Sequence, residues 1–250
     1  MRAILRRLGL IALSVFAFIT AWKVIVLIGG YPEYILPAPD VVALRAAEVI
    51  QNGTLQPHLL ATLQESVIGF AVGALVAVGA GILLAKSLTA ERVLSPYLVA
   101  AQAIPILALA PLIDIWFGGG LTARVVICAL IVFFPIAIAT MVGIRSTDPL
   151  LVEMARAYGA RPTQITRLLE LPSALPVLFG GLRVGVTLAV IGAVVAEWAG
   201  ASIGLGVLIN IADQGLFDTP LMFVALASLA MLGLTFYGAV LITERVLIPR

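Results

Sequence analysis

Charged side chains are scarce in this chain of 250 residues. Asp, Glu, Lys and Arg together make up 11% of it and hydrophobic residues 62%, and the mean hydropathy is +1.16. Soluble domains have about 25% charged and about 45–50% apolar residues. The scarcity of charge therefore excludes a water-soluble globular protein, and we expect no nucleic-acid partner. It indicates an all-α integral membrane protein in contact with lipid.

The residues that bind metals and form disulfides are nearly absent. Cys128 is the only cysteine, so no internal disulfide can form, and we interpret it as a packing residue inside an apolar run. His58 is the only histidine. A metal site would lack its usual ligands, and a hydrolase within the membrane would lack a base beside its nucleophile. We therefore predict no metal site and no catalytic residue.

A phosphate-binding loop for ATP is also missing. Such a loop needs the pattern G-x-x-x-x-G-K-[ST], and its nearest approach is AGILLAKS at residues 80–87. Ala80 and Ala85 replace both glycines, and the segment ends an apolar run instead of following a soluble strand. We predict that this chain is not an enzyme and carries no cofactor of its own.

Six apolar segments are long enough to cross a bilayer, since a helical span needs about 20 residues. The first could be mistaken for a secretory signal, because Arg6 and Arg7 precede it. Its apolar core is longer than the roughly 7–15 residues of a signal, and no small-residue cleavage site follows. We expect one domain, residues 1–250, with retained spans at about residues 8–28, 59–85, 96–117, 121–144, 175–198 and 221–242.

Positive charge lies mainly on one side of these spans. Cytoplasmic loops carry the excess of Lys and Arg, so we assign both termini and the segment 145–174 to the cytoplasm. Arg45 and Arg124 fall outside, and Lys23 and Arg183 fall within spans. The cytoplasmic side then holds eleven of the 15 basic residues, namely Arg2, Arg6, Arg7, Lys86, Arg92, Arg145, Arg156, Arg161, Arg167, Arg245 and Arg250.

The outer segment after the first span predicts a short amphipathic helix at the membrane surface. Asp40 is expected to cap it, and Asn52-Gly53 to end it after about Ile50. One face would carry Val42, Arg45, Ala46 and Val49.

The segment 145–174 is the longest polar interruption of the apolar pattern. Thr147 or Asp148 offers an N-cap, Pro149 suits a first helical turn, and Gly159 is placed to end that helix. A second short helix is expected from Pro162 through Leu171, with Pro172 as its stop. The spacing alone is equally typical of an ordinary interfacial helix. One face of the first helix carries Leu151, Met154, Ala155 and Tyr158.

This segment resembles the EAA loop of the permeases of ABC importers. The family pattern is Glu-Ala-Ala, three residues, Gly, nine residues, then Ile-x-Leu-Pro. Met154 stands at the second position and Leu169 at the Ile position, both as apolar replacements. The resemblance implies a coupling helix that docks on a nucleotide-binding subunit. The residues it assigns to coupling are Glu153, Met154, Ala155, Gly159, Leu169, Leu171 and Pro172.

The resemblance covers nearly the whole chain. YILPAPDVV, QAIPILALAPLIDIWFG, FFPIAIATMVGIRSTDP and AEWAGASIGLG are similar to the branch that handles sulfonates, taurine, nitrate, riboflavin and hydroxymethylpyrimidine. It implies a type I importer fold in a bacterial or archaeal cell membrane, with two copies of this permease as a homodimer. It further implies two ATPase subunits, which bind ATP and Mg²⁺, and an external solute-binding protein. A neutral heteroaromatic vitamin or precursor is the expected solute, with an anionic sulfonate or nitrate as the alternative.

Charges and prolines within the spans are candidates for the solute pathway. A buried charge costs about 2.5–3.5 kcal/mol, so each acidic residue either contacts the pathway or has a structural partner. Prolines break helices, and broken helices often line transport paths, although span prolines also occur without that role. Trp198 is alternatively an interfacial belt residue. The candidates are Gln102, Pro105, Pro111, Asp114, Glu65, Glu197 and Trp198.

Two further patterns favour structural roles. Arg183 and Glu197 lie about 21 Å apart on one straight helix, so we expect separate partners for them. The pairs Gly69 and Gly73, and Gly181 and Gly185, allow close helix contact. An ion-coupled carrier remains a rival function, although such carriers often contain inverted repeats and none is evident here.

Overall fold

The computed structural model describes residues 2–215 and 217–248, and these residues form helices and connecting turns without a strand. Two π-helical turns, Thr166–Glu170 and Ile211–Gly215, lie between helices. The α-helices are α1 Arg2–Gly29, α2 Pro39–Gln51, α3 Leu55–Lys86, α4 Leu88–Ala103, α5 Ile106–Trp116, α6 Gly120–Arg145, α7 Pro149–Ala157, α8 Pro162–Ile165, α9 Leu171–Trp198, α10 Leu205–Asn210 and α11 Thr219–Leu247.

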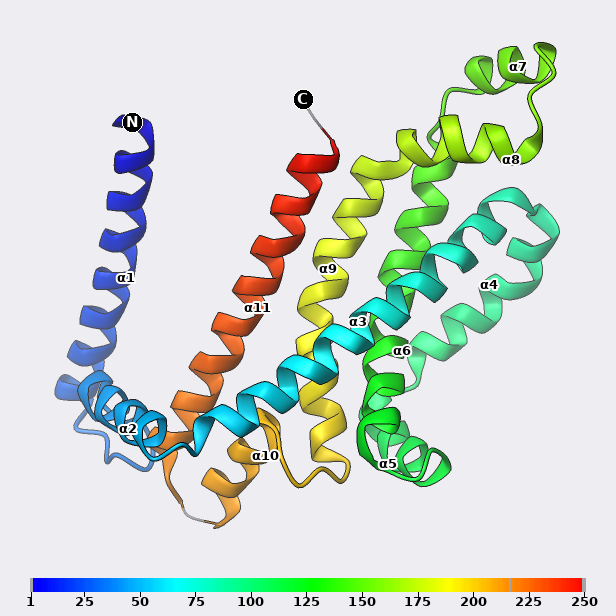
Figure 1. Ribbon diagram of the computed structural model, residues 1–250. Coiled ribbons are helices and arrows are strands. Elements are labelled where there is room, and N and C mark those ends of the chain that lie inside the picture. The colour runs from blue at the N-terminus through cyan, green and yellow to red at the C-terminus, as the bar shows by residue number, and fades with distance from the viewer. Residues whose placement is uncertain (1, 216, 249–250) are drawn as a thin grey trace.

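Five helices are long and apolar enough to cross a membrane, or six spans exist if the bent pair α4 and α5 counts as one. Figure 1 shows both termini, α7 and α8 at one end of the molecule and α2, α5 and α10 at the other. The prediction of an all-α membrane protein is confirmed. The charge pattern makes the end with the termini cytoplasmic. Arg250, which that pattern includes, lies outside the described residues.

The third span is broken, as expected, but by one proline rather than two. Between α4 and α5 the chain bends by 98°. Ile104 has an extended backbone (φ −81°, ψ 123°), which is the conformation that the residue before a proline prefers. Pro111 lies inside α5, which continues past it. The break therefore belongs to Pro105 alone.

The core is the close packing of α6 against α3 and α9. An added Cβ at Gly73 would lie 2.8 Å from the backbone oxygen of Ala129, and one at Gly181 would lie 3.2 Å from that of Pro135. Glycine is required at such positions because the facing backbone cannot move aside. The packing role predicted for the two glycine pairs is confirmed, and the tight contact holds these three helices together.

The outer helix α2 differs from the prediction at its start. Ala38 is the N-cap and Pro39 the first helical residue, so Asp40 lies in the first turn and forms an ion pair with Lys23 instead of capping. Proline needs no N–H partner and is well suited to that first position. Val49 is buried against α10 and α11, and Arg45 forms an ion pair of 2.6 Å with Asp218. The predicted apolar face thus packs on the protein.

Alanine at Gly73 should destabilise the fold, because its Cβ would meet the backbone of α6. Gly79 on the same helix has no atom within 4 Å of an added Cβ, so alanine there should be neutral or stabilising by about 0.5–1 kcal/mol through helix propensity. Thermal unfolding of both variants in detergent measures the difference. Equal melting temperatures would show that the α3 and α6 contact is less close than described.

Candidate functional site

The cytoplasmic segment folds as two short helices joined by a tight turn. The Asp148 carboxylate accepts a hydrogen bond of 2.9 Å from the Leu150 N–H and caps α7, so Asp148 and not Thr147 is the cap. Gly159 ends the helix with φ +78°, the left-handed conformation that favours glycine. The Gln164 side chain accepts from the Arg161 N–H at 2.8 Å and supports the start of α8.

Helix α7 presents an apolar face that no described residue covers. None of its residues is buried, and Met154 is 54% and Tyr158 86% exposed. A groove of about 430 Å³ lies between α7 and the following helix. Exposed apolar surface of this kind is typical of a binding site for another protein or for the membrane surface. The groove is lined by Leu151, Met154, Ala155, Tyr158, Gly159, Ala160, Gln164, Ile165, Leu168 and Leu169.

The predicted stop at Pro172 is wrong. The chain passes through the π-helical turn Thr166–Glu170 directly into α9, and the Leu171 N–H donates to the Thr166 carbonyl. A π turn widens the helix by one residue, and Pro172 follows as the second residue of α9, in its first turn, where a proline is tolerated. The cytoplasmic segment is therefore continuous with the span α9, and Leu171 and Pro172 are that span's first residues.

Two ion pairs connect this segment to neighbouring spans. Lys86 at the end of α3 pairs with the buried Glu170. Arg145 at the end of α6 pairs with Glu91 of α4 at 2.7 Å and donates to the Leu84 carbonyl at 2.9 Å. No pattern in the sequence predicts these contacts. Glu170 occupies the variable position before Leu171-Pro172, so the motif itself does not point to it.

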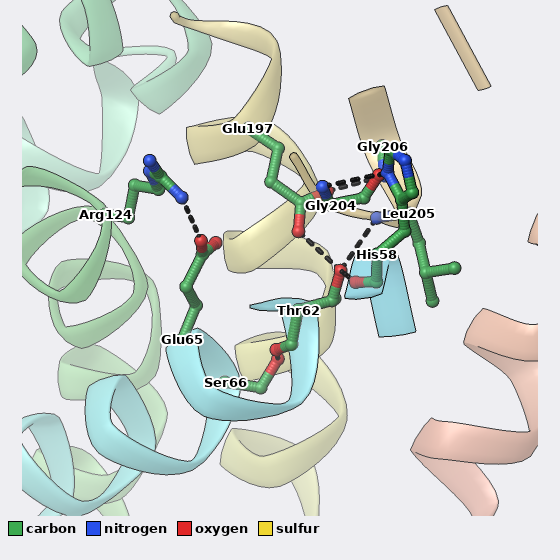
Figure 2. Close-up of polar contacts among 9 residues, drawn as sticks. All are labelled: His58, Thr62, Glu65, Ser66, Arg124, Glu197, Gly204, Leu205 and Gly206. Atoms are coloured by element: carbon green, nitrogen blue, oxygen red, sulfur yellow. Dashed lines mark hydrogen bonds and ion pairs between the residues drawn. The ribbon is translucent and has the colours of Figure 1, made fainter. Parts of the chain in front are cut away.

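A second polar group lies at the outer ends of α3 and α9. Figure 2 shows the Glu197 carboxylate between Thr62 and the start of α10. It accepts hydrogen bonds of 2.5 Å from the Thr62 hydroxyl and from the Gly206 N–H. The Thr62 hydroxyl also accepts from the Leu205 N–H at 2.8 Å. Glu197 therefore caps α10 and holds it on the two spans.

Glu65, one helical turn further into the membrane, has a different partner. Arg124 of α6 donates to its carboxylate at 2.5 Å, and Glu65 itself is buried. Figure 2 shows this pair beside the Glu197 group. Arg124, which the charge pattern places outside, reaches inward to neutralise it. Both buried glutamates thus have structural partners.

The remaining pathway candidates are spread over α4, α5 and α9, and one of them, Trp198, contacts the Glu197 group through Gly206. Gln102, Pro105 and Pro111 are exposed along α4 and α5. Asp114 is half-buried beside Gly119 and Gly200. Trp198 is 45% exposed, and its indole N–H donates to the Gly206 carbonyl at 3.0 Å.

Arg183, a further charge within a span, pairs with Glu244. As expected, Arg183 and Glu197 have separate partners. In residues 2–215 and 217–248 no three His, Cys, Asp or Glu side chains are grouped to hold a metal ion.

Comparison with known proteins gives a consistent result. The family described as "Binding-protein-dependent transport system inner membrane component" matches residues 57–247. The riboflavin transport system permease protein RibX of Chloroflexus aurantiacus is 48% identical over 91% of this chain and 84% of its own length. The formylaminopyrimidine transport permease protein ThiX of Halalkalibacterium halodurans is 36% identical, over 91% of this chain and 90% of its own.

A solved structure shares the fold. A chain of the MetNI methionine ABC transporter, in an inward-facing conformation, superimposes with a TM-score of 0.70 at 23% identity. The match covers 78% of this chain and 96% of that chain. The arrangement of spans is therefore that of a type I ABC importer permease.

Replacing Thr62 with valine should loosen α10 without changing the side-chain volume. The variant leaves the buried Leu205 N–H and one Glu197 oxygen without a partner, at a cost of about 1–3 kcal/mol for each group. Hydrogen exchange at the amides of Leu205 and Gly206 should become faster. Thr235→Val is the matched control, because that exposed hydroxyl donates only to its own helix. Unchanged exchange in Thr62→Val would contradict the capping role.

Proposed function

The chain belongs to the family of binding-protein-dependent transport system inner membrane components, and from that premise we propose that it imports a neutral heteroaromatic vitamin or precursor. It is the multi-pass permease subunit of an ATP-driven importer in the inner membrane. Riboflavin or a hydroxymethylpyrimidine is the proposed class of solute.

The uncovered apolar face of α7 is the observation that carries the coupling role. It lies at the cytoplasmic end of the molecule, opposite α2 and α10 (Figure 1). Met154 and Tyr158 are largely exposed on it, and Glu153 lies beside it on the same short helix. A helix with an apolar stripe fits into a groove of a partner protein. We assign that groove to the ATPase subunit.

The proposed partners follow from what the chain lacks. It has no phosphate-binding loop, so both ATP and Mg²⁺ are bound by a separate subunit, present in two copies, which hydrolyses the ATP. A second copy of this permease completes the pathway as a homodimer. An external solute-binding protein delivers the solute to the outer ends of the spans, where α10 and α5 lie.

The mechanism is alternating access driven from the cytoplasmic side. ATP binding closes the two ATPase subunits and displaces α7. Because the polypeptide continues from α8 into α9, and Lys86 ties Glu170 to α3, the displacement moves both spans. The outer ends of α3 and α9 then open or close together, since Thr62 and Glu197 join them.

Relatives and charge support the choice of solute. Two relatives are named for the transport of riboflavin and of formylaminopyrimidine, and both compounds contain nitrogen heterocycles. Arg124 is neutralised by Glu65, whereas Asp114 has no ion-pair partner within the described residues. An anionic sulfonate would be repelled by that carboxylate.

Valine at Gly159 should uncouple transport. An added Cβ meets no atom within 4 Å, so the effect comes from the left-handed backbone, which costs a β-branched residue about 1–2 kcal/mol. Gly159→Asn is the control, because asparagine tolerates this conformation. In vesicles with the partner subunits, we expect ATP-driven uptake to fall severalfold in the valine variant only. Full uptake by Gly159→Val would contradict the coupling role.

The solute is tested with the reconstituted importer. Uptake of labelled riboflavin should require ATP on the side of the membrane where the ATPase subunits are bound. It should be reduced by a pyrimidine competitor but not by an alkanesulfonate. Competition by the sulfonate alone would favour the alternative solute. Uptake driven by an ion gradient without the ATPase would overturn the importer mechanism itself.

A further inference from the structure

We propose that the cavity between the middle of α9 and the cytoplasmic end of α11 binds the phosphate headgroup of an anionic phospholipid. The cavity has a volume of about 400 Å³ and is lined by Arg183, Leu241, Glu244, Arg245 and Ile248. Pockets of this size hold small ligands. The inference does not depend on which solute the protein transports.

The arginines that line the cavity are not fully paired. Arg183 donates to Glu244 through one terminal nitrogen, while its Nε is buried and has no hydrogen-bond partner. Arg245, in the last turn of α11, has no ion-pair partner within the described part of the chain. Because Glu244 is already paired with Arg183, the lining has a formal surplus of one positive charge. A phosphate oxygen is an acceptor that arginine binds strongly.

The depth of the cavity matches that of lipid phosphates. Trp198 lies at the outer end of α9, and Arg183 is fifteen residues before it, or about 22 Å along the helix. The hydrocarbon core is about 30 Å thick, so the backbone of Arg183 lies about 8 Å inside its cytoplasmic boundary. Its side chain points to Glu244 near the end of α11 and so reaches the headgroup level.

The walls fit a lipid better than a soluble anion. Leu241 and Ile248 form apolar walls beside the arginines, as a headgroup joined to acyl chains requires. Basic pockets between spans on the cytoplasmic side are known to bind anionic headgroups. A soluble anion would gain nothing from the aliphatic residues.

The test compares two arginine variants of the full chain in detergent micelles doped with phosphatidylglycerol or phosphatidylcholine. Arg245→Gln removes one cation of the cavity without breaking an ion pair. Arg92→Gln is the control, since Arg92 is an exposed cation near the cytoplasmic end of α4, outside the cavity. We expect phosphatidylglycerol to bind the wild type and Arg92→Gln equally, and Arg245→Gln about fivefold more weakly, as expected for one cation near the surface.

Native mass spectrometry measures the lipid that the protein retains. The rise in the protein's melting temperature on addition of lipid measures binding. The proposal is supported if phosphatidylglycerol stabilises the wild type more than phosphatidylcholine does and Arg245→Gln loses this difference. It is overturned if both lipids act equally, or if the two variants respond alike. Equal stabilisation by inorganic phosphate at the same ionic strength would also overturn it, because the acyl chains would then contribute nothing. If the cavity is shielded from solvent only in a dimer, and no lipid is bound there, it is a contact with the second copy and not a lipid site.

Discussion

A carboxylate among apolar helices costs several kcal/mol unless another group neutralises it or donates hydrogen bonds to it. The two buried glutamates at the outer end of the bundle, Glu65 and Glu197, meet that requirement differently. Glu65 has the guanidinium of Arg124, whereas Glu197 has the Thr62 hydroxyl and the Gly206 N–H at the start of α10. The second solution fixes backbone as well as charge, because the carboxylate is bonded directly to the first turn of α10. The outer end of the bundle is therefore shaped by where these two acids find their partners.

Elements that are determined by residues close together in the chain could be predicted from the sequence. The apolar runs, the cap at Asp148 and the end of α7 at Gly159 depend on residues close together in the chain. Arg124, Lys86 and Thr62, which pair with Glu65, Glu170 and Glu197, lie 59, 84 and 135 residues from them. No local pattern indicates these three pairs. The prediction that Pro172 ends a helix is wrong for a related reason. A proline normally ends a helix, but Pro172 lies in the first turn of α9, directly after the π turn, and nothing in the local sequence demands that turn.

Glycine spacing explains why these polar contacts can be so close. At Gly69, Gly73 and Gly81 an added Cβ of α3 would collide with α6, so the two helices approach closely along most of their length. Side chains such as Thr62 and Glu65 then reach neighbouring spans. If larger residues replaced these glycines, the helices would lie further apart and the carboxylates would not reach their partners. Close packing is thus a precondition for the buried charges, not merely a source of van der Waals contact.

Helices α3 and α9 are joined at both of their ends. Lys86 and Glu170 connect them at the cytoplasmic end, and Thr62 and Glu197 connect them at the outer end. Two helices fixed at both ends, with α6 packed against both, resist sliding or splaying and move as one unit. By contrast, α4 has no buried residue and is separated from α5 by the break at Pro105. If the proposed function is correct, a displacement of α7 is therefore transmitted to the outer end of the bundle through α3, α6 and α9. On the same proposal, the change in access occurs where this unit meets α4, α5 and the second copy.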